Sequence, residues 1–485
     1  MSATTVPAWV QDAIFYQIFP DRFAASAQVE KPTHLEAWDT PPTTFGFKGG
    51  DLLGVVEHLD YLSDLGVNAL YLNPIFQSAS NHRYHTHDYF QVDPLLGGNT
   101  AFETLLAAAH ARGIRVILDG VFNHASRGFY PFSHTLENGA ASPYRDWFNF
   151  HGFPVRAYDS APNYDAWWNI AALPKFNHQN PQVREFLFRV AEHWVRAGID
   201  GWRLDVPGEI DDDEFWREFR RRVKNANPEA YIVGEIWQRG DRWLRGDQFD
   251  AVMNYQFTRL CLGFFANHDG IDHALAHEHS YGKISPLDTT EFTRSLADLL
   301  TWYPRETAYA QLNLLDSHDT ARFVTIARGD TSTLKLALLT MFCYVGAPML
   351  YYGDEIALEG RLDPDCRRAM IWEPSKRGQE MLAYTKRLIA LRKKYAALRR
   401  GEMLTLHAQS RTFAFARRLA DETVIVIVNA DREPVCLDLR VNGLCPNGTR
   451  LVEEWTRAEI TVQDGFASDL PVAPREGSVW VARGD

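Results

Sequence analysis

Cysteine is scarce in this sequence. Five cysteines occur in 485 residues, and none forms a CxxC pair. So sparse and odd a count excludes a disulfide scaffold and is typical of a protein from a reducing compartment. We therefore expect buried free thiols and a cytoplasmic protein.

Long apolar runs and an excess of basic residues are also missing. No segment reaches the ~20 apolar residues of a membrane span, and the N-terminus lacks the basic start and apolar stretch of a signal peptide. Lys and Arg together number 50 against 62 Asp and Glu, so the net charge is −12. A polyanion would be repelled by this charge on average. We expect neither a membrane nor a nucleic acid as partner.

What remains is an ordinary globular composition with many aromatic residues. Apolar residues make up 46% and charged residues 23% of the chain, which excludes disordered, collagen-like and coiled-coil classes. The length predicts two to four domains. The 14 tryptophans are a high number. Their rings stack on sugars as well as filling cores, so they are only a weak indication of a carbohydrate ligand.

Short apolar runs and helical patterns alternate along most of the chain. Amphipathic stretches that end in glycine separate the runs, as helices do. Eight such alternations are typical of an α/β protein with a (β/α)8 TIM barrel. The eight predicted strands are 14–20, 69–74, 115–120, 201–206, 231–236, 251–257, 312–319 and 348–355.

Two regions depart from this rhythm. Residues 121–177, after the third predicted strand, are rich in aromatic residues, Asn, Pro and Gly and predict a small inserted domain over the barrel mouth. After a last helix near 377–396, apolar residues alternate with period two, which predicts a C-terminal antiparallel β-sandwich. The expected domains are a barrel (1–120 and 178–397), the inserted domain (121–177) and the sandwich (398–485).

Polar residues follow several of the predicted strands. In a TIM barrel the active site lies at the carboxyl ends of the strands, so these residues are the first candidates for function. Any one of them alone is more often a helix cap or a solvated loop residue. Carboxylates at several strand ends, with His and Arg beside them, are hard to explain as caps. The residues are Asp119, Asn123, His124, Arg203, Asp205, Glu235, His318, Asp319, Asp354 and Glu355.

Facing carboxyl groups suit glycoside hydrolysis. One ionised group meets the oxocarbenium-like carbon, and one protonated group donates to the leaving oxygen. Arg203, two residues before Asp205 on a strand, points to the same face and is expected to keep Asp205 ionised. Glu235 has apolar neighbours, which favour its protonated form.

The segments that hold these residues resemble the α-amylase family of glycoside hydrolases. DGVFNH (119–124), GWRLDV (201–206), GEIW (234–237) and LLDSHD (314–319) are similar to its four ordered motifs, and LPKFN (173–177) to a fifth. FYQIFPDRF (15–23), FKGGDLLG (47–54), WLRGDQFDAVMNYQF (243–257) and APMLYYGDE (347–355) most resemble neopullulanases, cyclomaltodextrinases and maltogenic amylases. The resemblance runs from about Ala13 to the end of the chain.

The resemblance implies roles for individual residues. Asp205 would be the nucleophile, Glu235 the general acid/base, and Asp319 the third carboxylate, which holds and distorts the sugar. Arg203 would orient Asp205. The other implied sugar contacts are His124, His318, the stacking Tyr84, Trp237, and the pair Asp363 and Arg367, for which a surface ion pair is the alternative interpretation. The substrate would be an α-glucan, cleaved at α-1,4 bonds with retention.

Enzymes of these subfamilies usually carry an additional N-terminal β-domain, which closes the cleft and forms a dimer surface. Here the first barrel strand begins within about fifteen residues of the start. We therefore expect a monomer with an open cleft. It should cleave linear maltooligosaccharides and soluble starch at least as well as cyclodextrins, although Asp363 and Arg367 favour short oligosaccharides and rings.

Calcium ligands common in the family are replaced in this sequence. Glu209 stands where a histidine often binds calcium, and 24–38 replaces a calcium-binding loop. Asn123 and Asp51 are retained, but two ligands fall short of the six to eight that calcium takes. We expect no cofactor and no metal requirement. His85 stands where the subfamilies commonly have Asp, and Gln238 stands where they often have His. The sequence therefore does not determine which sugars the outer subsites prefer.

Two other functions remain open. A glucan transferase would resolve the same covalent intermediate with a sugar hydroxyl instead of water. A catalytically inactive amylase-like binding protein is disfavoured, because such a protein would not need Asp205, Glu235 and Asp319 together.

Overall fold

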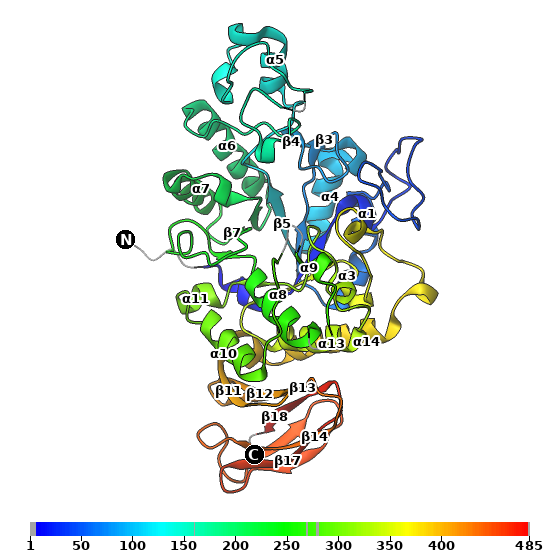
Figure 1. Cartoon of the computed structure of the whole chain (residues 1–485), viewed down its shortest axis with the longest axis vertical. Helices are drawn as coiled ribbons and strands as arrows, with labels where there is room; N and C mark the ends of the chain where they lie inside the picture. Colours follow the sequence, from blue (N-terminus) through cyan, green and yellow to red (C-terminus); the bar gives the residue numbers. More distant parts are fainter. Residues whose placement is uncertain (1–5, 160, 268–269, 278–280, 484–485) are drawn as a thin grey trace.

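The computed structural model describes residues 6–483 except 160, 268–269 and 278–280. The first five residues of the N-terminal segment considered above lie outside this range. Figure 1 shows three parts in a row: the inserted domain with α5 at one end, the barrel in the middle and the C-terminal sheets at the other end. No helix within the described ranges is long and apolar enough to cross a membrane.

Eight parallel strands form the barrel, in the order β8-β7-β6-β5-β2-β1-β10-β9. A parallel bridge between Met253 and Leu312 joins its two edges. This closure confirms the predicted TIM barrel. The strands are β1 (Phe15–Ile18), β2 (Ala69–Leu72), β5 (Arg115–Gly120), β6 (Gly201–Leu204), β7 (Tyr231–Gly234), β8 (Ala251–Val252), β9 (Leu312–Asn313) and β10 (Ala347–Tyr351).

Two strands are much shorter than the sequence predicts. The predicted strand 251–257 ends at Val252, because the Asn254 side chain accepts from the Phe257 N–H and begins α8. The predicted strand 312–319 ends at Asn313, and the rest is a loop that carries His318 and Asp319. Apolar residues continue into both segments, so periodicity alone gave no boundary.

Helices surround the barrel, and glycines end several of them, as predicted. Asn180 caps α6, and Gly198 ends it in the left-handed conformation with φ 111°. The helices are α1 (Pro20–Phe23), α2 (Leu52–Glu57), α3 (Leu59–Leu65), α4 (Gly98–Ala111), α6 (Pro181–Ala197), α7 (Asp213–Ala226), α8 (Tyr255–Cys261), α9 (His273–His277), α10 (Thr289–Leu299), α11 (Arg305–Ala308), α12 (Phe323–Ile326), α13 (Thr331–Cys343), α14 (Gln379–Lys394) and α15 (Ala396–Arg400).

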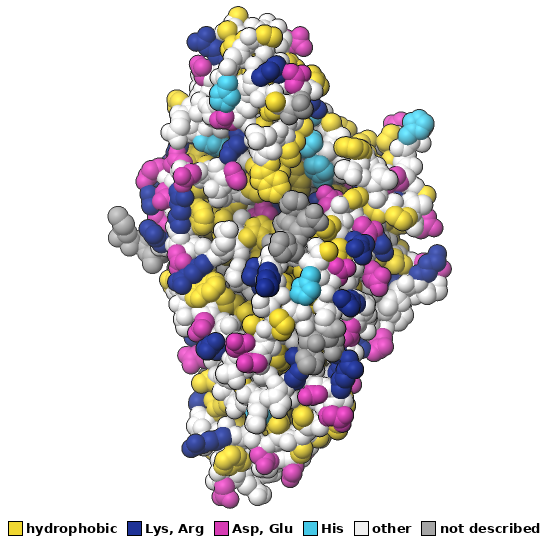
Figure 2. All heavy atoms as spheres, in the orientation of Figure 1, with side chains coloured by type: hydrophobic (Ala, Val, Ile, Leu, Met, Phe, Trp, Pro, Cys, Tyr) yellow, Lys and Arg dark blue, Asp and Glu magenta, His cyan; other side chains and the backbone are white. Residues whose placement is uncertain are grey.

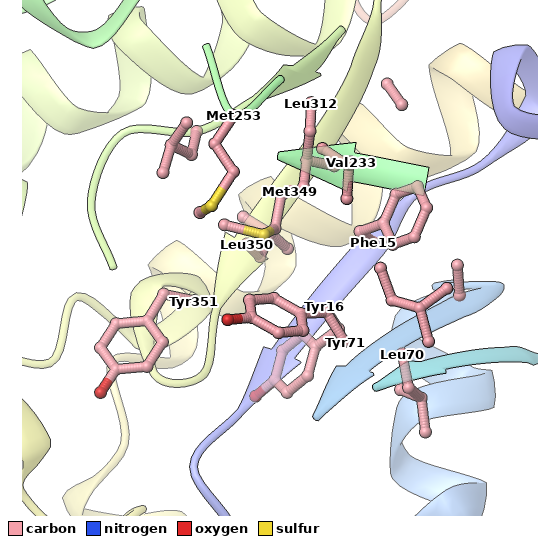
Figure 3. Close-up of a cluster of buried hydrophobic side chains, with 14 of the residues drawn as sticks. Phe15, Tyr16, Leu70, Tyr71, Val233, Met253, Leu312, Met349, Leu350 and Tyr351 are labelled. Carbon is pink, nitrogen blue, oxygen red and sulfur yellow. The ribbon is translucent and has the colours of Figure 1, made fainter. Parts of the chain in front are cut away.

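Buried apolar side chains fill the barrel. Figure 3 shows residues of β1, β2, β7, β9 and β10 meeting in one cluster. Phe15, Val233 and Met349 are among them, and each is fully buried. The strands carry these apolar residues because both faces of a parallel sheet are covered. The cluster gives the polar strand ends a rigid base.

The inserted segment after β5 has little regular structure. It contains α5 (Tyr130–Asn138) and isolated bridges, including one between His124 and Lys175. A hairpin of β3 (Phe76–Ser78) and β4 (Thr86–Val92) lies earlier in the chain and was not predicted. Buried aromatic rings such as Phe132 and Phe148 hold the inserted segment together. Its boundaries at 121 and 177 stay a prediction.

The C-terminal part is antiparallel, as predicted. One sheet has the order β11-β12-β13-β18-β15-β16, and β14 pairs with β17. Phe413 and Val426 pack into the barrel core, whereas Ala414 and Ile425 face a second core beneath β14 and β17. The strands are β11 (Glu402–Gln409), β12 (Thr412–Leu419), β13 (Glu422–Asn429), β14 (Val435–Arg440), β15 (Arg450–Glu453), β16 (Glu459–Thr461), β17 (Phe466–Val472) and β18 (Glu476–Arg483).

Candidate active site

The strand register brings the predicted carboxylates together. Arg203 on β6 is opposite Asp119 on β5 and Val233 on β7. Asp205 and Glu235 come next at the ends of β6 and β7, where the Glu235 N–H donates to the Leu204 carbonyl at 3.0 Å. Side chains two residues apart on a strand share a face. Asp205 therefore lies beside Arg203, as expected.

Arg203 binds three carboxyl groups at once. Its Nη1 donates to both oxygens of Asp119, at 2.8 and 3.0 Å, and to Asp205 Oδ1 at 3.2 Å. Its Nη2 forms an ion pair with Glu235 Oε2 at 2.9 Å. The guanidinium is fully buried. One cation thus holds the predicted nucleophile and the predicted acid side by side.

Arg203 does not distinguish Asp205 from Glu235, since it contacts both. Both residues are also similarly buried, with 8% and 7% exposed. Burial raises the pKa of Asp205 well above its usual value, and repulsion from Glu235 and Asp119 adds to this against the attraction of Arg203. Burial likewise raises the pKa of Glu235. Three carboxyl groups around one guanidinium favour retention of a proton within the cluster.

Tyr84 and His318 form the wall next to this cluster. The Tyr84 hydroxyl donates to Asp119 Oδ2 at 2.8 Å, and its ring lies parallel to that of His318 with centroids 5.5 Å apart. Gln17 Nε2 lies 2.9 Å from His318 Nδ1 and can only donate. His318 Nε2 therefore carries the proton and points to the Tyr84 hydroxyl at 2.5 Å. Burial lowers the pKa of His318 well below its usual value and keeps it neutral.

The third predicted carboxylate is more exposed than the other two. The Asp319 side chain is 33% exposed and lies 3.1 Å from His318 Nε2 and 3.3 Å from Arg367 Nη2. Arg367 Nη1 also pairs with Asp363 at 3.1 Å. Asp363, Arg367 and Asp319 are therefore one connected group beside His318, rather than a separate surface ion pair.

Trp237 and His124 complete the predicted set. Trp237 Nε1 donates to Glu235 Oε1 at 3.2 Å, and its ring stacks on Tyr255 at 3.7 Å. His124 is buried, and its ring stacks on Trp167 with centroids 5.5 Å apart. Trp237 thus orients the predicted acid, a role that the sequence did not indicate.

Several residues of the site were missed or undervalued from the sequence. The Tyr71 hydroxyl donates to Asp119 Oδ2 at 2.6 Å, and Gln17 also donates to Asn73 Oδ1 at 3.0 Å. Asp119 was recognised at its strand end but not included in the predicted site. The sequence did contain an indication of these residues, because Gln17, Tyr71 and Asn73 are polar side chains in or just after apolar strands.

Asp51, one of the two retained candidate calcium ligands, has other partners, and so has Glu209 at the histidine position, whereas the buried Asn123 Oδ1 has no partner among the described residues. Asp51 Oδ1 accepts from the Gly54 N–H at 2.7 Å, and its Oδ2 pairs with Lys31 at 2.8 Å. Glu209 Oε2 pairs with Lys175 Nζ at 3.0 Å. Across the described part of the chain, no three His, Cys, Asp or Glu side chains are grouped to hold a metal ion. Ammonium groups thus supply positive charge beside both carboxylates.

Exhaustive treatment with EDTA is expected to leave activity and melting temperature nearly unchanged. A metal that binds only the native state adds stability by mass action, so its removal would lower the melting temperature. Scanning calorimetry of the treated protein, with and without added calcium, checks this. A loss of many degrees that calcium restores would contradict the expectation.

Comparison with known families agrees with this architecture. Residues 17–401 match the family described as "Alpha amylase, catalytic domain", and residues 403–481 match "Neopullulanase-like, C-terminal domain". A cyclomaltodextrinase from a Bacillus species is 47% identical over 430 residues, which cover 88% of this chain and 74% of the relative. The predicted resemblance is confirmed.

Solved structures share the whole fold. A crystal structure of a protein from Thermus thermophilus superposes with a TM-score of 0.94 at 49% identity, covering 98% of this chain and 99% of that one. A debranching enzyme from Nostoc punctiforme gives a TM-score of 0.89 at 46% identity, with the same coverage.

Proposed function

Because the chain belongs to the α-amylase family of glycoside hydrolases, we propose that it hydrolyses α-1,4-glucosidic bonds of maltooligosaccharides and related α-glucans. Asp205 attacks the anomeric carbon, while Glu235 donates a proton to the leaving oxygen. Water, activated by Glu235, then resolves the covalent glycosyl-enzyme. Asp319, His318, Tyr84 and His124 hold the sugar during both steps.

The arrangement of Asp205 and Glu235 on one guanidinium carries this proposal. Retaining glycosidases need their two carboxyl groups only ~5–5.5 Å apart, whereas inverting enzymes leave ~6.5–9.5 Å for a water molecule. Contact with a shared Arg203 supports the close arrangement. Asp319, whose side chain is one-third exposed, would accept hydrogen bonds from sugar hydroxyls.

Early products of maltotriose cleavage are expected to have the α-anomeric form. Two successive displacements at the anomeric carbon restore the configuration of the substrate. Proton NMR during the first minutes, before mutarotation, measures this. Initial release of the β-anomer would contradict the role of Asp205 as nucleophile. No cleavage at all would favour the inactive binding protein.

Two related activities would appear in the same product analysis. Products longer than maltotriose would indicate transfer to a sugar acceptor. The debranching enzyme among the similar structures makes α-1,6 bonds a second candidate target. Pullulan separates the two linkages, because cleavage at α-1,4 bonds yields panose or isopanose and cleavage at α-1,6 bonds yields maltotriose. The monomeric state and the preference for linear glucans stay predictions.

A further inference from the structure

Two consecutive tryptophans in the inserted domain stack on each other. The ring centroids of Trp167 and Trp168 lie 4.6 Å apart, with the planes at 13°. Trp167 also stacks on His124, at 5.5 Å and 22°. The three rings form a ladder from a predicted sugar contact to Trp168, which is 64% exposed. On the face in Figure 2, hydrophobic side chains and histidines gather between the inserted domain and the barrel.

The backbone adopts an unfavourable conformation at this ladder. Trp168 has φ 50° and Asn169 has φ 59°, so two successive residues other than glycine are left-handed. This conformation costs energy for a bulky residue, and such strain gathers at functional sites. The exposed surface of Trp168 returns little hydrophobic stabilisation to the fold. Strain at a largely exposed ring is consistent with a ligand-binding role.

The segment around the two tryptophans is nevertheless well anchored. The Trp167 N–H donates to the Leu173 carbonyl at 2.9 Å, and Ala166 forms a bridge with Pro174. Trp167 Nε1 is buried and has no hydrogen-bond partner among the described residues. An indole N–H can only donate, and a sugar hydroxyl would accept from it. An anchored pair of rings with such a donor is suited to a carbohydrate.

The strand order indicates which side of the scissile bond the ladder serves. Arg367 and Asp363 follow β10, whereas His124 follows β5. In the barrel, β1 and β2 separate β10 from β5. Glu235, which must face the leaving group, follows β7 on the far side of β6. The inserted domain also contacts the loop after β6 through Lys175 and Glu209. The ladder thus lies away from Arg367, on the side of the barrel where the neighbouring β6 and β7 carry Asp205 and Glu235.

We propose that Trp167 and Trp168 form a platform for the glucosyl unit on the leaving-group side of the cleavage point. Trp168 stacks on the sugar ring, and Trp167 supports it and offers its N–H to a hydroxyl. This inference rests on the proposed function. It assigns the inserted domain the recognition of the departing, or accepting, part of an α-glucan chain.

The substitution Trp168→Ala tests the platform with two substrates. In α-maltosyl fluoride the leaving group is a fluoride ion, so no sugar occupies the proposed platform. We expect kcat/KM for maltotetraose to fall about tenfold, because one lost aromatic contact amounts to about that factor. Cleavage of maltosyl fluoride should change less than about twofold by the same reasoning. Trp168→Tyr should restore most of the maltotetraose activity.

Tyr158→Ala is the matched control. Tyr158 is another exposed aromatic residue of the inserted domain, 76% exposed, with its ring beneath the Arg127 guanidinium. It should leave both substrates unaffected. Equal losses on both substrates for Trp168→Ala, or no loss on either, would overturn the platform. A wild-type protein inactive on both substrates would instead overturn the proposed function.

Discussion

Replacement of Asp205 by asparagine is expected to lower kcat on maltotetraose by ~10⁴-fold or more, with substrate binding largely retained. The asparagine amide cannot form the covalent glycosyl-enzyme. Because the nucleophile stabilises the transition state and not the bound substrate, its loss lowers kcat and leaves the affinity for the substrate largely unchanged. Stopped assays give kcat, and calorimetry with the variant gives the dissociation constant. Near-normal turnover would contradict the assignment.

Glu235→Gln separates the two carboxyl roles. Fluoride leaves without a proton, so this variant should still form the intermediate from maltosyl fluoride and then accumulate it, because the base for the second step is missing. Mass spectrometry detects the added maltosyl group, which Asp205→Asn should never show. Glu209→Gln is the control, since this half-exposed carboxylate lies on the loop after β6 and pairs with Lys175. It should keep turnover within about twofold of wild type, because it makes no transition-state contact.

Replacement of Arg203 by methionine is expected to damage both stability and catalysis. The side chain is fully buried, and its removal leaves Asp119, Asp205 and Glu235 without their shared cation. Loss of one partner from a buried ion pair costs about 3–5 kcal/mol. We expect kcat to fall at least ~10²-fold, because the two catalytic carboxyl groups lose their common anchor. Urea denaturation and initial rates measure the two effects.

The effect of Arg203→Met should depend on pH. Burial already raises the pKa of Asp205 and Glu235, and Arg203 opposes the rise. Without Arg203, the pKa values of Asp205 and Glu235 should both rise further. The acid limb of the kcat/KM profile should therefore move to higher pH. A carboxyl group with a raised folded-state pKa binds its proton more tightly in the folded protein, so its ionisation costs stability. The loss of stability should thus grow as pH rises above ~4, the value in the unfolded chain.

Arg203→Lys provides the conservative comparison. A lysine keeps one charge but cannot reach three carboxyl groups as the planar guanidinium does. Its stability should lie between those of the wild type and of Arg203→Met, with the acid limb shifted less. An unchanged pH profile in both variants would show that Arg203 serves the fold alone.

The barrel was predictable because its strands are buried on both faces. Such strands read as short apolar runs, and the polar residues after them mark the carboxyl ends where a site forms. Asp205 and Glu235 were found in this way. The β3–β4 hairpin was not, because residues 81–88 between its apolar parts are rich in His and other polar residues.

Other features depend on tertiary structure and leave no local signal. The sequence places Arg203 beside Asp205, but only the barrel register brings Asp119 and Glu235 to the same guanidinium. The shared contact of Asp205 and Glu235 with Arg203 could not be predicted for that reason. Likewise, nothing in the run 165–170 predicts left-handed backbone at Trp168, since this conformation usually requires glycine.

Heat should not release the C-terminal sheet from an intact barrel. Along β12 and β13, one row of side chains belongs to the barrel core and the next row to the core beneath β14 and β17. Separation would expose Phe413, Phe415 and Val426 of the sheet together with the barrel surface against which they pack. The penalty for such exposure couples the melting of the two parts. Loss of catalysis on heating and loss of the distant sheet are therefore one cooperative event.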